Sequence, residues 1–88
     1  MTEELMNQVA LVTGGGSGLG RAIAEKYAKN GAKVVILGRH EITLQETAKT
    51  NSNISYVVAD LTKDEDITKV ANYIKDNFRK LQFQIEHF

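Results

Sequence analysis

The sequence lacks cysteine and proline, and neither sign of charge is in excess. Without cysteine the chain can form no disulfide, zinc–thiolate site or thiol nucleophile, which suits a reducing compartment. Its 11 basic side chains balance 11 acidic ones, so no strong field attracts nucleic acid or a membrane surface. Residues 1–6 carry acids where a signal peptide would be basic, and no apolar run is long enough to span a bilayer. We therefore expect a cytoplasmic protein with no nucleic-acid or membrane partner.

The length of 88 residues is enough for one small domain, or for a piece of a larger one. We therefore expect no second domain within these 88 residues. Hydrophobic residues make up 42% of the chain and charged residues 25%, which is typical of globular proteins rather than of disordered ones.

Glycine is concentrated in one segment, since five of the seven glycines lie between Gly14 and Gly20. An apolar run over 9–12 precedes this segment, and an apolar pattern with helical spacing over 19–28 follows it, which predicts a strand, a loop and a helix. Further strands are predicted over 33–37, 54–59 and 81–86, and further helices over 41–49 and 62–78. Strands that alternate with helices predict βαβ units, and so an α/β fold with a parallel sheet.

The last predicted helix has the clearest start signal. Residues 62–65 have the spacing of a capping box, which predicts that the helix begins at Thr62. Asp64, Glu65 and Asp66 fall in its first turn, where the helix dipole favours negative charge. We interpret these acids as a complement to the dipole, and we predict no metal site.

The glycine loop is suited to bind phosphate, because backbone N–H groups and the positive end of a helix dipole converge at such a turn. A P-loop is not predicted, because Arg21 and Ala22 stand where that pattern needs a lysine and a hydroxyl. The fingerprint G-x-G-x-x-G, started at Gly14, fails at Leu19. A methyltransferase-like G-x-G-x-G does occur over 14–18, but no acidic residue stands just ahead of it.

The pattern that fits is T-G-x-x-x-G-x-G from Thr13 to Gly20, which resembles the cofactor loop of the short-chain dehydrogenase/reductase family. Other segments that resemble the N-terminal half of that family are 9–12, 21–24, 31–35 and 59–61. The resemblance covers residues 8 to about 81. It implies a Rossmann-type doubly wound parallel sheet with strand order 3-2-1-4, and a dinucleotide cofactor.

The resemblance also implies which residues contact the cofactor. They are Gly14, Ser17, Gly18, Leu19, Gly20, Asp60 and Leu61, together with Arg39, which is discussed next. The first glycine would permit the tight turn, the later ones would let the backbone approach the pyrophosphate, and Ser17 and Leu19 would contact the phosphates. Asp60 would form a hydrogen bond with the adenine. Two simpler interpretations stay open: the glycines allow a close helix–sheet crossing, and Asp60 is a turn carboxylate beside Thr62.

The residues at the end of the second predicted strand bear on the form of the cofactor. Gly38 stands where NAD-preferring members of the family carry an acid that binds the ribose hydroxyls, and Arg39 adds a charge that attracts a 2′-phosphate. NADP is therefore favoured over NAD. NAD stays open, because Ser17 occupies the family's second basic position and Glu41 lies nearby. Arg39 could also be a solvated strand-end charge, and we interpret His40 as a surface histidine.

The catalytic residues of the family are not found in this sequence. Hydride transfer there relies on a serine, a Tyr-x-x-x-Lys pair and an asparagine. The residues four positions after Tyr27, Tyr56 and Tyr73 are Gly31, Asp60 and Asn77. We therefore predict no catalytic residue in this chain, and we expect a small-molecule substrate only in a full-length relative.

Taken together, these patterns predict a single partial NAD(P)-binding domain over 1–88, with an N-terminal extension over 1–7 and an atypical tail over 81–88. The predicted function is that of an NADP-dependent oxidoreductase of the short-chain type, represented by its dinucleotide-binding half. The alternatives are a non-catalytic nucleotide-binding module and a truncated, non-functional gene product. Because one predicted helix faces four strands, we also expect self-association through the incompletely covered sheet face.

Overall fold

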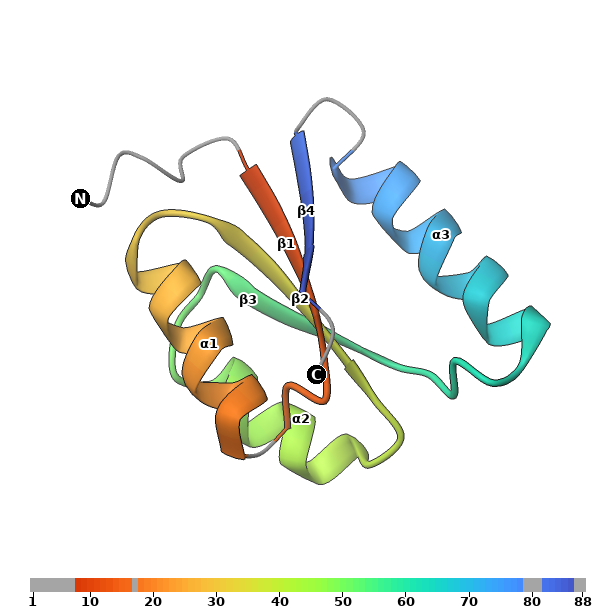
Figure 1. Cartoon of the computed structure of the whole chain (residues 1–88), viewed down its shortest axis with the longest axis horizontal. Helices are drawn as coiled ribbons and strands as arrows, with labels where there is room; N and C mark the ends of the chain where they lie inside the picture. The colour runs from red at the N-terminus through yellow and green to blue at the C-terminus, as the bar shows by residue number, and fades with distance from the viewer. Residues whose placement is uncertain (1–7, 17, 79–81, 87–88) are drawn as a thin grey trace.

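The chain folds as strands and helices in strict alternation, as a computed structural model shows (Figure 1). The structure describes residues 8–16, 18–78 and 82–86, the last segment by its backbone. The strands are β1 (Gln8–Thr13), β2 (Lys33–Gly38), β3 (Ile54–Val58) and β4 (Gln82–Glu86), and the helices are α1 (Gly18–Lys29), α2 (Glu41–Ala48) and α3 (Asp64–Phe78). The predicted α/β alternation is confirmed.

The four strands form one sheet with the order β3-β2-β1-β4, and each neighbouring pair is parallel. Val12 of β1 pairs with Ile36 of β2, which in turn pairs with Tyr56 of β3. Because all strands run in the same direction, their carboxyl ends meet at one edge of the sheet. In open α/β sheets this is the edge at which ligands bind.

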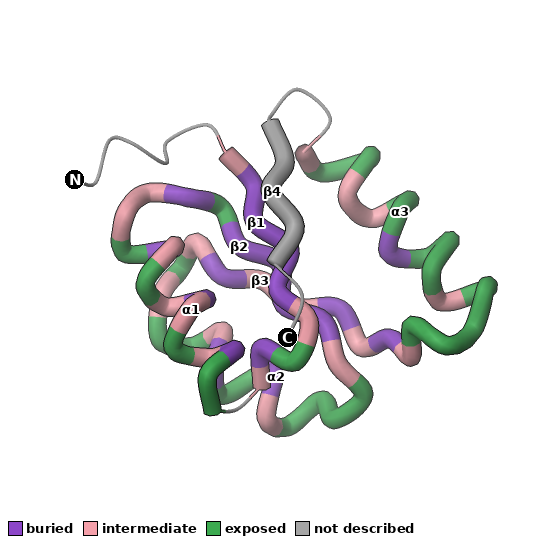
Figure 2. Tube along the Cα trace, viewed as in Figure 1, coloured by how far each residue is buried: buried purple, intermediate pink, exposed green. Residues whose placement is uncertain are grey.

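Helices cover both faces of the sheet, and successive strand residues face opposite sides. The residues buried between the sheet and α1 or α2 include Ala10, Val12, Val34, Ile36 and Ile54 from the strands, with Ala24, Ala28 and Leu44 from the helices. The residues buried on the opposite face are Val9, Leu11, Val35, Leu37, Val57 and Ala59, with Val70 of α3. Figure 2 shows the buried stretches along β1 and β2 between these layers. The arrangement is the Rossmann-type doubly wound fold predicted above.

Of the described helices, α3 is the one that packs on the second face of the sheet, where Tyr73, Ile74 and Phe78 are partly buried beside Val70. This uneven coverage is the feature on which the expected self-association rests. Self-association itself stays a prediction.

The start of α3 differs from the sequence prediction. The helix begins at Asp64, because the Thr62 hydroxyl donates to Oδ1 of Asp60 at 2.6 Å instead of capping the helix. The carbonyl oxygen of Lys63 accepts the first hydrogen bonds, from the N–H groups of Asp66 and Ile67. The predicted capping box is therefore wrong.

Three predictions concern segments outside the described residues. They are the N-terminal extension over 1–7, the contact of Ser17 with phosphate, and the ends of the predicted tail at 81 and 87–88. Within the predicted tail, residues 82–86 form β4, which pairs with β1.

Candidate functional site

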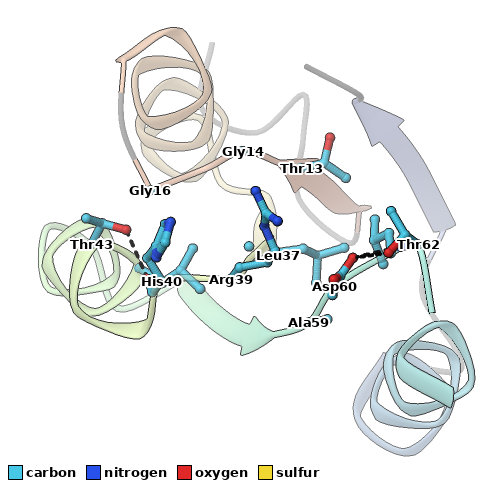
Figure 3. Close-up of a pocket in the computed structure, with 13 residues that line it drawn as sticks. Thr13, Gly14, Gly16, Leu37, Arg39, His40, Thr43, Ala59, Asp60 and Thr62 are labelled. Carbon is cyan, nitrogen blue, oxygen red and sulfur yellow. Dashed lines mark hydrogen bonds between the residues drawn. The ribbon is translucent and has the colours of Figure 1, made fainter.

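A cleft of about 400 Å³ lies at the carboxyl ends of β1, β2 and β3 (Figure 3). Its lining comes from Thr13, Gly14 and Gly16 after β1, from 37–40 at the end of β2, from Thr43 and Leu44 of α2, and from 59–62 after β3. The cleft therefore occupies the edge of the sheet where the topology predicts a ligand.

Four of the predicted cofactor residues line this cleft together: Gly14, Arg39, Asp60 and Leu61. They come from the ends of three different strands, and the parallel topology brings them together. Gly18, Leu19 and Gly20 lie in the first turn of α1 and, among the described residues, are not part of the lining. Their predicted contact with the pyrophosphate stays a prediction.

The glycine loop adopts a backbone that ordinary side chains disfavour. Gly14 has a φ of 71°, and its N–H donates to the carbonyl oxygen of Leu37 at 3.1 Å, which ties the loop to the end of β2. Gly18 has a φ of 58°, and a Cβ there would meet nothing within 4 Å. The backbone conformation thus favours glycine at these two positions.

Gly20 has a different role, which is close packing. A Cβ at this position would run into the carbonyl oxygen of Gly14, so α1 crosses the loop at backbone contact. At Gly20 the close contact is thus between the helix and the loop, and the alternative of a helix–sheet crossing stays open. The crossing brings the first turn of α1 beside the loop that borders the cleft, and the N-terminus of a helix favours negative charge.

The sequence pattern missed the roles of Gly15 and Gly16, which it treats as spacer positions. A Cβ on Gly15 would lie 2.5 Å from Cγ2 of Ile36, and one on Gly16 would lie 2.6 Å from Oγ1 of Thr43. The loop therefore packs against both β2 and α2. No signal in the sequence pointed to Thr43, because its contact depends on how α2 returns toward the loop.

Arg39 is exposed and follows directly after β2. Figure 3 shows its guanidinium directed into the cleft, on the side of Gly14. His40 also lines the cleft and is exposed, so it is a surface residue within the site. Its side chain makes no cap hydrogen bond to α2, while its carbonyl oxygen accepts a hydrogen bond from Oγ1 of Thr43 at 2.9 Å.

Asp60 lies in a tight turn after β3, the strand beside the one that Arg39 follows. Its Oδ1 accepts hydrogen bonds from the hydroxyl of Thr62 at 2.6 Å and from the N–H of Thr62 at 2.9 Å. The N–H of Asp60 donates to Oδ2 of Asp66 at 2.7 Å, which fixes the turn to α3. The hydroxyl of Thr62, then its N–H, lower the pKa of Asp60, and the charges of Arg39 and Lys63 lower it further. Asp60 is thus a turn carboxylate, and its contact with adenine stays a prediction.

The lining of the cleft includes a cationic side chain and an anionic acceptor. Arg39 supplies a positive charge that suits a phosphate, and Asp60 supplies an ionised acceptor that suits an N–H donor. Leu61, Leu37 and Ala59 add apolar surface between polar groups. This set of residues fits the adenosine and phosphate part of a dinucleotide.

Other classes of site are not indicated by the described residues. Within 8–16, 18–78 and 82–86, no group of three or more metal-ligating side chains is found. In the same part of the chain, none of the helices combines the length and apolar character that a membrane crossing requires.

Comparison with known proteins places this geometry in a family. The model of the short chain dehydrogenase family matches residues 8–86. The NADP-dependent (R)-specific alcohol dehydrogenase of Lentilactobacillus kefiri is 40% identical over 81 residues, covering 89% of this chain and 32% of that protein. The 3-hydroxyacyl-CoA dehydrogenase type-2 of Drosophila melanogaster is 38% identical over 82 residues, covering 92% of this chain and 32% of that protein.

Solved structures agree with these matches. The 3-ketoacyl-(acyl-carrier-protein) reductase of Brucella melitensis, complexed with NADH, superposes with a TM-score of 0.80 at 35% identity. The match covers 86% of this chain and 32% of that one. The chain thus spans about a third of the length of the curated relatives it matches.

Proposed function

This chain belongs to the short-chain dehydrogenase/reductase family, and from that membership we propose that it binds NADP through its adenosine half. In this proposal the 2′-phosphate lies against Arg39, the adenine lies near Asp60 and Leu61, and the pyrophosphate lies over the glycine loop. The bound cofactor would supply hydride for the reduction of a carbonyl group or accept hydride from an alcohol.

The observation that carries the choice of NADP is the pairing of Gly38 with Arg39 at the end of β2. Gly38 is not among the described glycines with positive φ, so its backbone does not require glycine. A Cβ there would touch the end of a flexible side chain, Cδ2 of Leu44, at 3.3 Å. Glycine at this position leaves the strand end without a carboxylate, while Arg39 lines the cleft. A 2′-phosphate therefore meets an attractive charge and no acid at this position.

The catalytic step is proposed to need residues beyond those of this sequence. None of its three tyrosines is followed four positions later by lysine. This observation favours a second candidate function, a nucleotide-binding module that performs no hydride transfer. Both candidates share the same cofactor site, and they differ in whether bound NADPH is consumed.

A calorimetric titration of the chain with NADPH and NADH tests the cofactor proposal. We expect tighter binding of NADPH, and a loss of roughly tenfold or more in NADPH affinity in Arg39→Ala, because a charge-assisted contact to phosphate contributes about 1.5–3 kcal/mol. NADH affinity should change little. Arg39→Lys is the matched control, since it retains the charge and should keep part of the preference. Equal losses for both cofactors in Arg39→Ala would contradict the proposal.

The second candidate is tested by following NADPH absorbance with a panel of aldehydes and ketones. Binding without oxidation of NADPH would support the non-catalytic module. Turnover by this chain alone would refute the claim that its catalytic residues are missing.

A further inference from the structure

Glu41 is the acid nearest in sequence to the proposed 2′-phosphate site, yet its carboxylate is held elsewhere. It is the first residue of α2 and follows Arg39 and His40, both of which line the cleft. Glu41 itself is not among the described residues of the lining. Its Oε2 accepts a hydrogen bond from the hydroxyl of Tyr56 at 3.1 Å.

Tyr56 is well placed to act as this anchor. It lies on β3, and its ring is partly buried against the core beneath α1 and α2. The hydroxyl oxygen of Tyr56 accepts a hydrogen bond from Nε2 of Gln45 at 3.0 Å. Because Gln45 is the donor in this bond, the single hydroxyl proton of Tyr56 is left to donate to Glu41. The chain of hydrogen bonds therefore has one direction, from Gln45 through Tyr56 to Glu41.

A Glu41 side chain without this anchor would act against phosphate binding. Glu41 lies in the first turn of α2, where the helix dipole favours a negative charge, and it is two positions from Arg39 in the sequence. The carboxylate would compete for Arg39 and would repel the 2′-phosphate. Over a separation of several ångströms near a surface, this repulsion corresponds to roughly a three- to tenfold change in affinity.

We propose that Tyr56 is a specificity-positioning residue, which holds the Glu41 carboxylate away from the cleft and so preserves the preference for a 2′-phosphorylated nucleotide. The inference rests on the proposed binding of NADP. It explains how an acid can stand beside the phosphate site without reversing the choice of cofactor.

The test measures the affinity of the chain for 2′,5′-ADP and for 5′-ADP by calorimetry at low salt. Tyr56→Phe should weaken 2′,5′-ADP by roughly three- to tenfold and leave 5′-ADP nearly unchanged. Adding Glu41→Gln to Tyr56→Phe should restore the affinity, because the released side chain is then neutral. The effect should shrink as salt is raised, since exposed charges are screened. Tyr73→Phe, on the other face of the sheet, is the matched control and should change neither ligand.

The outcomes separate this inference from the proposed function. If the wild-type chain shows no preference for 2′,5′-ADP, both are overturned. If the preference is present and depends on Arg39, but Tyr56→Phe leaves it unchanged, the positioning role alone is overturned. Equal weakening of both nucleotides, or no rescue by Glu41→Gln, would mean that Tyr56 acts through the fold rather than through charge.

Discussion

Replacing Gly20 by alanine tests the close crossing between α1 and the glycine loop. The new Cβ would overlap the carbonyl oxygen of Gly14 and would lie 2.8 Å from its carbonyl carbon. Backbone atoms cannot turn away, so the helix or the loop must shift, and overpacking of this kind costs about 1–3 kcal/mol. Alanine also favours the helix by up to about 1 kcal/mol. With about 2 kcal/mol for the overlap and about 0.5 kcal/mol for the helix, the net loss in the free energy of unfolding should be about 1.5 kcal/mol.

Gly38→Ala is the matched control, since the substitution is the same and the site borders the same cleft. Its Cβ would meet Cδ2 of Leu44 at 3.3 Å, and that side chain can give way. We expect little change in stability, or a gain of up to about 1 kcal/mol from a less flexible unfolded chain. For a domain of this size about 1 kcal/mol corresponds to about 4–8 °C in Tm. Thermal and urea unfolding followed by circular dichroism would measure the difference, and equal Tm values for Gly20→Ala and Gly38→Ala would refute the crossing.

Two further predictions concern the turn at Asp60. The pKa of Asp60 should lie below its ordinary value of 3.8 in an NMR titration, and Thr62→Val should raise it, because the hydroxyl of Thr62 is the largest cause of the shift. An unchanged pKa in Thr62→Val would contradict the role of the Thr62 hydroxyl. Because the pKa of Asp60 is lower in the folded state than in the unfolded state, its ionised carboxylate stabilises the fold above the unfolded-state pKa. That stabilisation is lost as the pH falls through the folded-state pKa. Asp66→Ala should lower the free energy of unfolding by about 1–2 kcal/mol, because the N–H of Asp60 loses its partner at 2.7 Å, and wild-type stability in a urea titration would show that the bond is dispensable.

Local pattern was sufficient to predict the alternation of strands and helices. Continuous apolar runs predict β1 and β2, and the cluster of glycines between 14 and 20 predicts the loop that follows β1. The parallel topology then follows, and with it the edge where Gly14, Arg39 and Asp60 meet. These three residues are separated in sequence, but each follows the end of a strand.

Contacts made by returning helices could not be predicted in this way. Thr62 has capping-box spacing, yet its hydroxyl donates to Asp60, which is the turn interpretation that the sequence had left open. The approach of Thr43 to Gly16 and the hydrogen bond between Tyr56 and Glu41 depend on where α2 packs on the sheet. Sequence spacing places a residue on an element, but the packing of that element decides what its side chain touches.

The claim that the cleft binds the adenosine half of NADP can be tested most directly by NMR. Addition of NADPH to the ¹⁵N-labelled chain should shift the backbone amides of 14–16, 38–43 and 59–62, around the lining of the cleft. Amides at the opposite edge of the sheet, at 30–33 and 51–54, should stay in place. Shifts confined to that opposite edge, or no shifts around the cleft at saturating NADPH, would contradict the assignment of the site.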